Sequence, residues 1–509
     1  MILESDVFVL NPYFRLKNMG CFTVLFGAND VGTWRLHSSF GIILSLCDGE
    51  RTVSEIAKIV APFTGLDDET ESYTMSLGTV IKFLRWMSFS KEEQRALSEK
   101  DTQEQKPVSP QKHEECPLLE RSVFNRVFTD FRPYSIEYDP YSFLSIPGAT
   151  NYMGVLHEPF PFYINWHLTS VCSTDCKYCY LGRRKVEPLK IERLLSLIGE
   201  AANIGVFAID LNGGDVLLHP HLEEVLAVLS ERKFLPIALS TKSFLSREKA
   251  RGLASHSKNL LNEFQFSIDT DDNAIAEYLV GTSGYCDMIF QSIVNALDAG
   301  LHVAAKVVIT PYNVLTVPRL YRKLKNLGVS KIRLAAYARS GFHHTDDLFL
   351  NDPCYQWLTK EVEVLRNEFP EEKINIQNGV PTHQALKNES RQKNWETRSK
   401  CTAGRSGMTI CSDGKVIPCE QMPETEEYFC GDLAHQSILE IWNGNRLKEM
   451  TYGMPREKFR GQPCYDCEER EECLDVMGTC IRDLAFLYGN IYQPPPNCYR
   501  HDVPFIRQT

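Results

Sequence analysis

The sequence predicts an α/β protein built around a parallel sheet, with a smaller domain before it and a cysteine-rich domain after it. Three observations support this fold class. Strand-like and helix-like segments alternate from Phe162 to about Gly341. Three cysteines follow the first of these strands at C-x3-C-x2-C spacing, and a second group of cysteines lies between residues 401 and 498. Alternation over this length favours parallel strands joined by right-handed crossovers.

The composition excludes several classes of protein. The chain has 509 residues, 43% of them hydrophobic, which is enough for two or three domains. A net charge of −11 argues against a nucleic-acid partner, because phosphate binding requires a basic surface. No apolar run reaches the ~18 residues of a membrane helix, and no signal-peptide pattern is present. We expect a cytoplasmic protein with no membrane partner. Of its 17 cysteines, those clustered at 172–179 and 401–498 are expected to bind metal instead of forming disulfides.

Residues 1–90 are predicted to form an independent domain of short strands followed by three helices. Turn residues separate the strand candidates, and Thr52 and Glu55 have capping-box spacing before an apolar helix. The order of elements and the segments Leu10–Phe14 and Leu46–Val53 resemble the leader-peptide recognition domain of peptide-maturation systems, which is winged-helix-like and similar to the pyrroloquinoline-quinone peptide chaperone PqqD. The resemblance implies that an unpaired sheet edge accepts an extended peptide. The alternative is a domain that only stabilises or dimerises the chain.

Residues 91–116 are predicted to be a solvated linker, because they are rich in Lys, Glu, Gln and Ser with almost no aromatic residue. We assign residues 117–345 to the parallel-sheet domain, 346–400 to a bridging segment without an assigned function, and 401–509 to the cysteine-rich domain. These boundaries follow the changes in composition along the chain.

The central motif is the loop that follows the predicted strand Phe162–Leu168. It carries Cys172, Cys176 and Cys179. Three thiolates on a short loop can hold three corners of a cubane iron-sulfur cluster and leave one iron open. The alternative is a zinc site, which requires a fourth ligand; His167 is the nearest candidate but lies within the predicted strand.

These three cysteines, with aromatic Tyr178 before the last of them, resemble the signature of the radical S-adenosylmethionine (SAM) superfamily. The resemblance implies that the open iron of a 4Fe-4S cluster binds SAM and cleaves it reductively to a 5′-deoxyadenosyl radical, which abstracts a hydrogen atom from the substrate. It also implies a partial (β/α)6 barrel, with the active site at the carboxyl ends of the strands. An external electron donor such as flavodoxin or ferredoxin is implied as well.

Two further segments are expected to contact SAM. Gly213, Gly214 and Asp215 resemble the Gly-Gly-Glu motif of the superfamily, in which the glycines allow close backbone approach and the carboxylate pairs with the SAM ammonium. This chain has Asp in place of Glu, which shortens the reach of the carboxylate. Ser267 falls where the family places a polar contact on its fourth strand. Each of these residues alone is also compatible with an ordinary strand-ending turn.

The last cysteine group resembles the SPASM extension, which carries two auxiliary 4Fe-4S clusters. The match includes the C-x12-Gly-x4-C segment around Gly414 and the later C-x2-C-x5-C segment, although the six-residue spacer before Cys480 is longer than usual. The implied ligands are Cys401, Cys419, Cys464, Cys467, Cys473, Cys480 and Cys498.

Two clusters need eight cysteines for complete thiolate ligation, and the motif supplies seven. The eighth could be Cys411 or Cys430. If neither binds, one auxiliary cluster keeps an open iron that could bind a substrate thiolate. The C-x2-C pair is also compatible with a zinc ribbon.

Together, these resemblances predict a radical SAM enzyme that modifies a ribosomally made precursor peptide. A thioether or other side-chain crosslink is the leading product, while epimerisation, decarboxylation and backbone excision remain open. No catalytic residue is identified beyond the cofactor ligands. The two rivals are a maturase of a folded enzyme, like the anaerobic sulfatase-maturing proteins, and a non-catalytic iron-sulfur electron carrier or peptide-binding scaffold.

Overall fold

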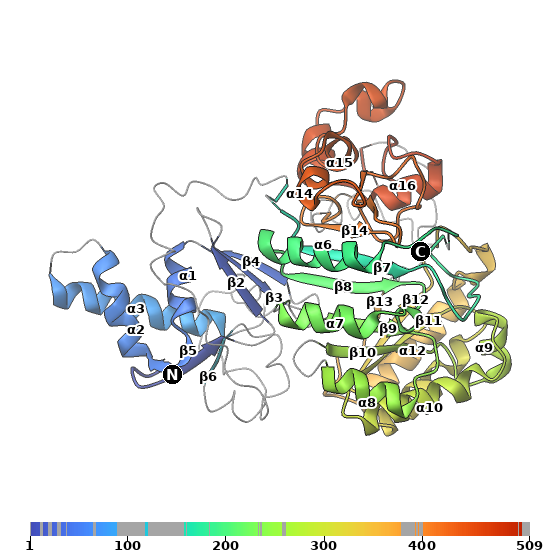
Figure 1. Cartoon of the computed structure of the whole chain (residues 1–509), viewed down its shortest axis with the longest axis horizontal. Coiled ribbons are helices and arrows are strands. Elements are labelled where there is room, and N and C mark those ends of the chain that lie inside the picture. The colour runs from blue at the N-terminus through green and yellow to red at the C-terminus, as the bar shows by residue number, and fades with distance from the viewer. Residues whose placement is uncertain are drawn as a thin grey trace. The chain divides into compact units, whose positions relative to one another are not determined.

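The computed structural model divides the chain into two compact units, Met1–Gly154 and Val155–Thr509, which are described separately (Figure 1). The structure describes the following residues: 2–10, 14–18, 23–27, 32–36, 38–64, 68–88, 118–120, 157–158, 160–182, 184–232, 234, 237–256, 261–377, 392, 395, 401–496 and 498–500. The predicted linker at 91–116 lies outside them.

The first unit contains two small antiparallel sheets with strand orders β5-β1-β6 and β2-β3-β4. In the described part of this unit, three α-helices accompany them. The elements are β1 (Val7–Leu10), β2 (Phe14–Asn18), β3 (Thr23–Gly27), β4 (Gly32–Leu36), α1 (Ser38–Ser45), β5 (Asp48–Thr52), α2 (Val53–Val60), η1 (Ala61–Thr64), α3 (Glu69–Met87) and β6 (Leu118–Glu120).

The capping box predicted at Thr52 is confirmed. The Thr52 hydroxyl accepts a hydrogen bond from the Glu55 amide, and the Glu55 carboxylate accepts one from the Thr52 amide. These bonds satisfy amides that the first turn of a helix cannot pair. One face of α2, with Ile56, Ala57 and Val60, is buried in a core that also includes residues of both sheets.

The second unit is built on a ten-stranded sheet with the order β13-β12-β11-β10-β9-β8-β7-β14-β15-β16. Its strands are β7 (Tyr163–Thr169), β8 (Ala208–Gly213), β9 (Ile237–Thr241), β10 (Leu261–Ser267), β11 (Val303–Ile309), β12 (Lys331–Ala336), β13 (Ile376–Gln377), β14 (Gly407–Ile410), β15 (Lys415–Ile417) and β16 (Gly431–Asp432). Strands β7 to β13 are all parallel, which confirms the predicted parallel sheet.

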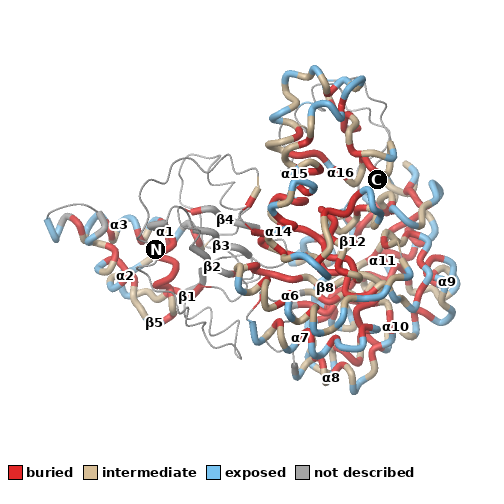
Figure 2. The backbone as a smooth tube through the Cα atoms, turned by 45° about the horizontal axis from the view of Figure 1, so that its top comes forward, coloured by how far each residue is buried: buried red, intermediate tan, exposed pale blue. Residues whose placement is uncertain are grey.

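Because β7 to β12 are neighbours in chain order, right-handed crossovers place the connecting helices on one face of the sheet, which makes it a partial barrel. Figure 2 shows that these strands and the inner sides of the helices are buried. The helices of the second unit are α6 (Ile191–Ile204), α7 (Leu222–Glu231), α8 (Arg247–His256), α9 (Asn273–Val280), α10 (Tyr285–Asp298), α11 (Val317–Asn326), α12 (Asp352–Glu368), α14 (Ile438–Trp442), α15 (Asn445–Thr451) and α16 (Ile481–Tyr488), with 3-10 or π turns at η4 (Val216–Leu218), η5 (Val314–Thr316), η6 (Asp346–Leu348), η7 (Arg456–Phe459), η8 (Pro463–Tyr465) and η9 (Glu471–Val476).

The cysteine-rich region is joined to the barrel by backbone pairing. β14 lies parallel to β7, with Gly407 opposite Tyr163 and Ile410 opposite Trp166. A Cβ atom at Gly407 would lie 2.2 Å from the Tyr163 ring, so only glycine allows this approach. The first strand of the barrel therefore has barrel strand β8 on one side and β14 on the other.

No helix among the described residues combines the length and the apolar character needed to cross a membrane.

Candidate active site

The cysteine loop follows the carboxyl end of β7. The thiols of Cys172 and Cys176 each lie 3.4 Å from the hydroxyl oxygen of Thr174, so one side chain lies between them. Cys179 follows in a turn, where its amide donates to the Cys176 carbonyl. All three are free thiols.

Backbone hydrogen bonds hold this loop on two sides. The amides of Asp175 and Lys177 donate to carbonyls of the last turn of α9, at Val280 and Leu279. On the other side, His343 donates its amide to the Cys179 carbonyl, and its Nδ1 lies 2.9 Å from the Cys176 carbonyl oxygen. The main chain is thus fixed and the thiols remain available to bind a metal.

At Gly213 and Gly214, the end of β8 lies close to the main chain that precedes Cys172. The Gly214 amide donates to the Thr169 carbonyl at 2.7 Å, and a Cβ atom on Gly214 would lie 2.1 Å from the Val171 carbonyl oxygen. The close approach expected of these glycines is therefore made to the protein backbone. It fixes the end of β8 against the start of the cysteine loop.

Asp215 is buried and connects the ends of two strands. Its carboxylate accepts hydrogen bonds from the Thr241 hydroxyl at 2.8 Å, the Lys242 amide at 2.7 Å and the Leu217 amide at 3.1 Å. These bonds join the loop after β8 to the end of β9. Its pairing with the SAM ammonium stays a prediction, as does the polar contact of Ser267, whose carbonyl accepts a hydrogen bond from the Tyr285 hydroxyl.

A partly buried lysine lies beside Tyr178. Lys242 Nζ is 3.1 Å from the Tyr178 hydroxyl and 3.5 Å from the Asp269 carboxylate, which also accepts a hydrogen bond from Tyr178. Burial raises the pKa of the Cys176 thiol, and the positive charge of Lys242 opposes this effect. Sequence reasoning missed this group because Tyr178 and Asp269 are 91 positions apart.

The carboxy-terminal cysteines form two groups. In the first, burial and the neighbouring Glu420 and Cys401 raise the pKa of Cys419 to about 11, against a backbone hydrogen bond at Gln421. Desolvation of the thiol, Asp483 and Cys401 also raise the pKa of Cys480, although the residue as a whole is exposed. Cys401 therefore lies close enough to both Cys419 and Cys480 for thiolates at these positions to repel it.

The second group contains Cys464, Cys467 and Cys498. Burial, followed by the charges of Cys498 and Cys467, raises the pKa of Cys464 to about 12. Cys473 lies in η9, which begins soon after Cys467. Thiolates held this close need positive charge between them, which the irons of a cluster supply. Both groups and the β7 loop therefore fit iron-sulfur clusters.

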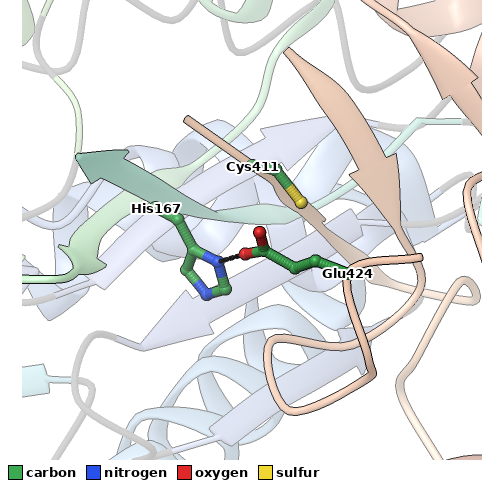
Figure 3. Close-up of side chains that lie close together, drawn as sticks. All are labelled: His167, Cys411 and Glu424. Carbon is green, nitrogen blue, oxygen red and sulfur yellow. Dashed lines mark hydrogen bonds and ion pairs between the residues drawn. The ribbon is translucent and has the colours of Figure 1, made fainter. Parts of the chain in front are cut away.

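The two candidates for the eighth auxiliary ligand lie in different surroundings. Cys411 groups with His167 and Glu424, with ligand atoms within 4.8 Å of one another (Figure 3). Cys430 is buried, with its sulfur 3.8 Å from that of Met450.

Comparison with known protein families agrees with this site. The model of the radical SAM superfamily matches residues 166–324, and that of SPASM, an iron-sulfur cluster-binding domain, matches residues 401–468. The predicted radical SAM domain, its SAM-binding 4Fe-4S cluster and the auxiliary clusters are thereby confirmed. The structure and these matches together establish the α/β radical SAM fold.

Relatives and solved structures extend the comparison. The chain is 24% identical over 342 residues to a PqqA peptide cyclase of Granulibacter bethesdensis, covering 65% of this chain and 85% of the cyclase. It is 22% identical over 287 residues to the subtilosin biosynthesis protein AlbA of Bacillus subtilis, covering 56% of this chain and 60% of AlbA. The structure of Streptococcus suis SuiB bound to precursor peptide SuiA superposes with a TM-score of 0.60 at 14% identity, covering 98% of this chain and 100% of SuiB.

Proposed function

We propose that this protein is a radical SAM enzyme that modifies a ribosomally synthesised precursor peptide by joining two of its side chains, in a thioether or other crosslink. The observation that carries the proposal is the fixed loop of three free thiols at the carboxyl end of β7. Sequence relatives named as a peptide cyclase and as a bacteriocin biosynthesis protein support the peptide substrate.

In this proposal, Cys172, Cys176 and Cys179 hold a 4Fe-4S cluster whose fourth iron is left for SAM. The bound cofactor supplies the radical that removes a hydrogen atom from the peptide. The protein holds the loop in place through Gly214 and Asp215. The proposed neighbours of SAM are Tyr178, Gly213, Gly214, Asp215 and Ser267.

The auxiliary clusters would take up the electron released when the new bond forms. Cys464, Cys467, Cys473 and Cys498 make a complete ligand set, whereas Cys401, Cys419 and Cys480 leave one iron open. Cys411 groups with His167 and Glu424, and the Cys430 sulfur lies beside that of Met450. These surroundings favour a cluster ligand set that includes neither Cys411 nor Cys430. An open iron could bind a thiolate of the peptide during crosslinking.

The first unit would capture the leader segment of the precursor. In the described part of the chain, β2 and β4 are each paired on one side only, to β3. An extended peptide can add to such an edge through main-chain hydrogen bonds. The assignment as a winged-helix-like, PqqD-like domain belongs to this proposal. The fold shared with SuiB over 98% of the chain supports it.

The test is an anaerobic incubation of the iron-reconstituted enzyme with SAM, dithionite and a short peptide encoded beside it. A product lighter by two hydrogens supports a crosslink, and unchanged mass contradicts it. The Cys172→Ala variant is the control and should form neither product nor 5′-deoxyadenosine. Replacing dithionite by reduced flavodoxin or ferredoxin then tests the predicted electron donor.

The same incubation separates the rival functions. A non-catalytic carrier or scaffold would yield no 5′-deoxyadenosine. A maturase of folded enzymes would form 5′-deoxyadenosine yet leave every small peptide unmodified.

A further inference from the structure

A ring nitrogen near the carboxyl end of β7 lacks a hydrogen-bond partner among the described residues. His167 is 1% exposed, and this nitrogen, Nε2, is buried. An unpaired buried nitrogen loses its hydrogen bonds to water without replacement, so buried nitrogens are usually satisfied. A bound ligand is therefore a suitable source of the hydrogen-bond partner that His167 Nε2 lacks.

His167 faces the interior of the partial barrel. Ile164, Trp166 and Leu168 of β7 belong to the hydrophobic core shared with the covering helices. Because side chains alternate along a strand, His167 lies on the opposite face. On β8, Ile209 and Leu211 are likewise in the core, which puts Asn212 on the interior face, directly opposite His167 in the register.

Asn212 adds a second free acceptor. Its Nδ2 donates to Glu420 at 3.2 Å, which fixes the orientation of the amide, and its Oδ1 is buried without a partner in the described part of the chain. Two neighbouring acceptors at the strand ends, where the active site of this fold lies, require a ligand group that donates hydrogen bonds.

The protein orients the His167 ring from its other nitrogen. Nδ1 lies 2.8 Å from Glu424 Oε1, and Glu424 Oε2 accepts a hydrogen bond from Arg184, whose terminal nitrogens pair with Asp413. Burial disfavours the charge on Glu424, but His167 and Arg184 hold the pKa of this carboxyl below its ordinary value. A carboxylate only accepts, so Nδ1 carries a proton, and Nε2 points away from Glu424 (Figure 3). In a neutral ring with this tautomer, Nε2 is the acceptor.

A metal ion held by His167, Cys411 and Glu424 is the alternative. Arg184 already occupies one oxygen of Glu424 and puts a positive charge beside the position. A metal ion at this position would lie beside the Arg184 guanidinium or have to displace it from Glu424, which disfavours the metal site.

We propose that His167 is the catalytic base that accepts a proton from the peptide as the crosslink forms. The inference rests on the proposed function. Joining R–H to R′X–H removes two hydrogens. The first leaves as an atom and ends in 5′-deoxyadenosine. The second hydrogen leaves the N–H, O–H or S–H group as a proton and an electron. Nε2 of His167 takes the proton, and an oxidised auxiliary cluster would take the electron. A carboxylate-oriented histidine is a recurrent arrangement for such a proton acceptor.

The test compares His167→Gln with a matched control, His157→Gln. His157 Nε2 is also buried without a partner among the described residues, and its ring stacks on Trp442 and Tyr452, but it precedes the barrel strands. Both variants should keep the wild-type iron content, electron paramagnetic resonance spectra and peptide affinity, the last measured on cluster-free protein. His167→Gln should lower the ratio of crosslinked peptide to 5′-deoxyadenosine by about 10²-fold, with partial rescue by added imidazole. His157→Gln should leave this ratio unchanged.

The outcomes separate the two proposals. A wild-type enzyme that cleaves SAM but never modifies the peptide overturns the proposed function and this inference together. Modification by the wild type and an unchanged ratio in His167→Gln overturn only the inference.

If His167→Gln loses its clusters, Glu424→Gln provides the second variant. It keeps the size of the side chain and should lower the same ratio, and an unchanged ratio overturns the inference. Cys411→Ser should leave the ratio unchanged. A fall in the ratio accompanied by loss of bound zinc would support the metal site and overturn the proton acceptor.

Discussion

Two glycines near the cysteine loop differ in the space around them. A Cβ atom at Gly214 would meet the Val171 carbonyl oxygen at 2.1 Å, whereas one at Gly182 has no neighbour within 4 Å. We expect Gly214→Ala to displace the loop at a cost of about 3 kcal/mol, because backbone atoms on both sides must move. Iron content and thermal unfolding should fall in Gly214→Ala and stay at wild-type values in Gly182→Ala. Equal iron content in the two variants would contradict this prediction.

An ion pair beside α9 predicts one pH effect. Arg319 donates two hydrogen bonds of 2.7 Å to Asp271 and holds the pKa of this carboxyl below its ordinary value. A depressed folded pKa stabilises the protein above the unfolded pKa, and this contribution is lost as the pH falls through the folded value. Asp271→Asn should therefore lower the free energy of unfolding at pH 7 by about 0.5–1 kcal/mol, since Arg319 is largely exposed.

The difference between Asp271→Asn and wild type should shrink as the pH falls below 4, where the wild-type carboxyl also becomes neutral. Chemical unfolding at a series of pH values measures it. A difference that grows on acidification would contradict the assignment.

At the residue scale, the sequence predicts the cluster ligands but not the residues that hold them in place. Cys172, Cys176 and Cys179 are recognisable because a short loop fixes their spacing. The pair formed by His167 and Glu424 joins residues 257 positions apart, and no local pattern predicts such a contact. The local pattern places His167 in the predicted strand but gives no sign of the carboxylate that orients its ring.

The cysteine-rich elements are short, and removal of iron should affect them first. η8, η9 and α16 together carry Cys464, Cys473 and, at the start of α16, Cys480. Without iron, the thiols of each group lose the charge that holds them together. Hydrogen exchange after chelation should therefore accelerate in these elements and remain slow in β7 to β12. α14 serves as an internal reference, because its capping box and the Trp442 hydrogen bond to Glu158 involve no cysteine. Uniform acceleration across the unit would contradict this expectation.

Elements with a strong apolar pattern were predictable, and polar ones were not. β11 (Val303–Ile309) is apolar apart from Lys306, which is typical of a buried strand. Such a pattern is missing from α8, whose sequence Arg247–His256 is mostly charged or small, and from β5, a short strand of polar residues that depends on pairing with β1. Tertiary contacts decide such segments more than local propensity does.

For the molecule as a whole, leader capture by the first unit predicts how the enzyme treats a shortened substrate. A core peptide without its leader should be modified with a KM raised at least tenfold, because the affinity of the lost strand addition is removed while the chemistry is retained. Adding the separate leader to full-length precursor should inhibit by competition. Steady-state assays with both peptides measure these effects, and equal KM values would exclude a leader site that contributes to binding.

The architecture of the whole molecule was partly predictable. The parallel sheet followed from alternation, and the cofactors followed from the cysteines. The pairing of β14 with β7 did not, because Gly407–Ile410 is a four-residue strand whose partner lies in another part of the sequence. The cysteine-rich region therefore continues the barrel sheet through backbone hydrogen bonds.

This pairing has a consequence for biosynthesis. β7 emerges from the ribosome roughly 240 residues before β14, which at about 5–20 residues per second is a delay of about 12–48 s. Throughout that interval one edge of β7 has no strand to pair with. The nascent chain thus carries an open sheet edge for a little under half of the translation of its 509 residues, and this edge is available to chaperones during that interval.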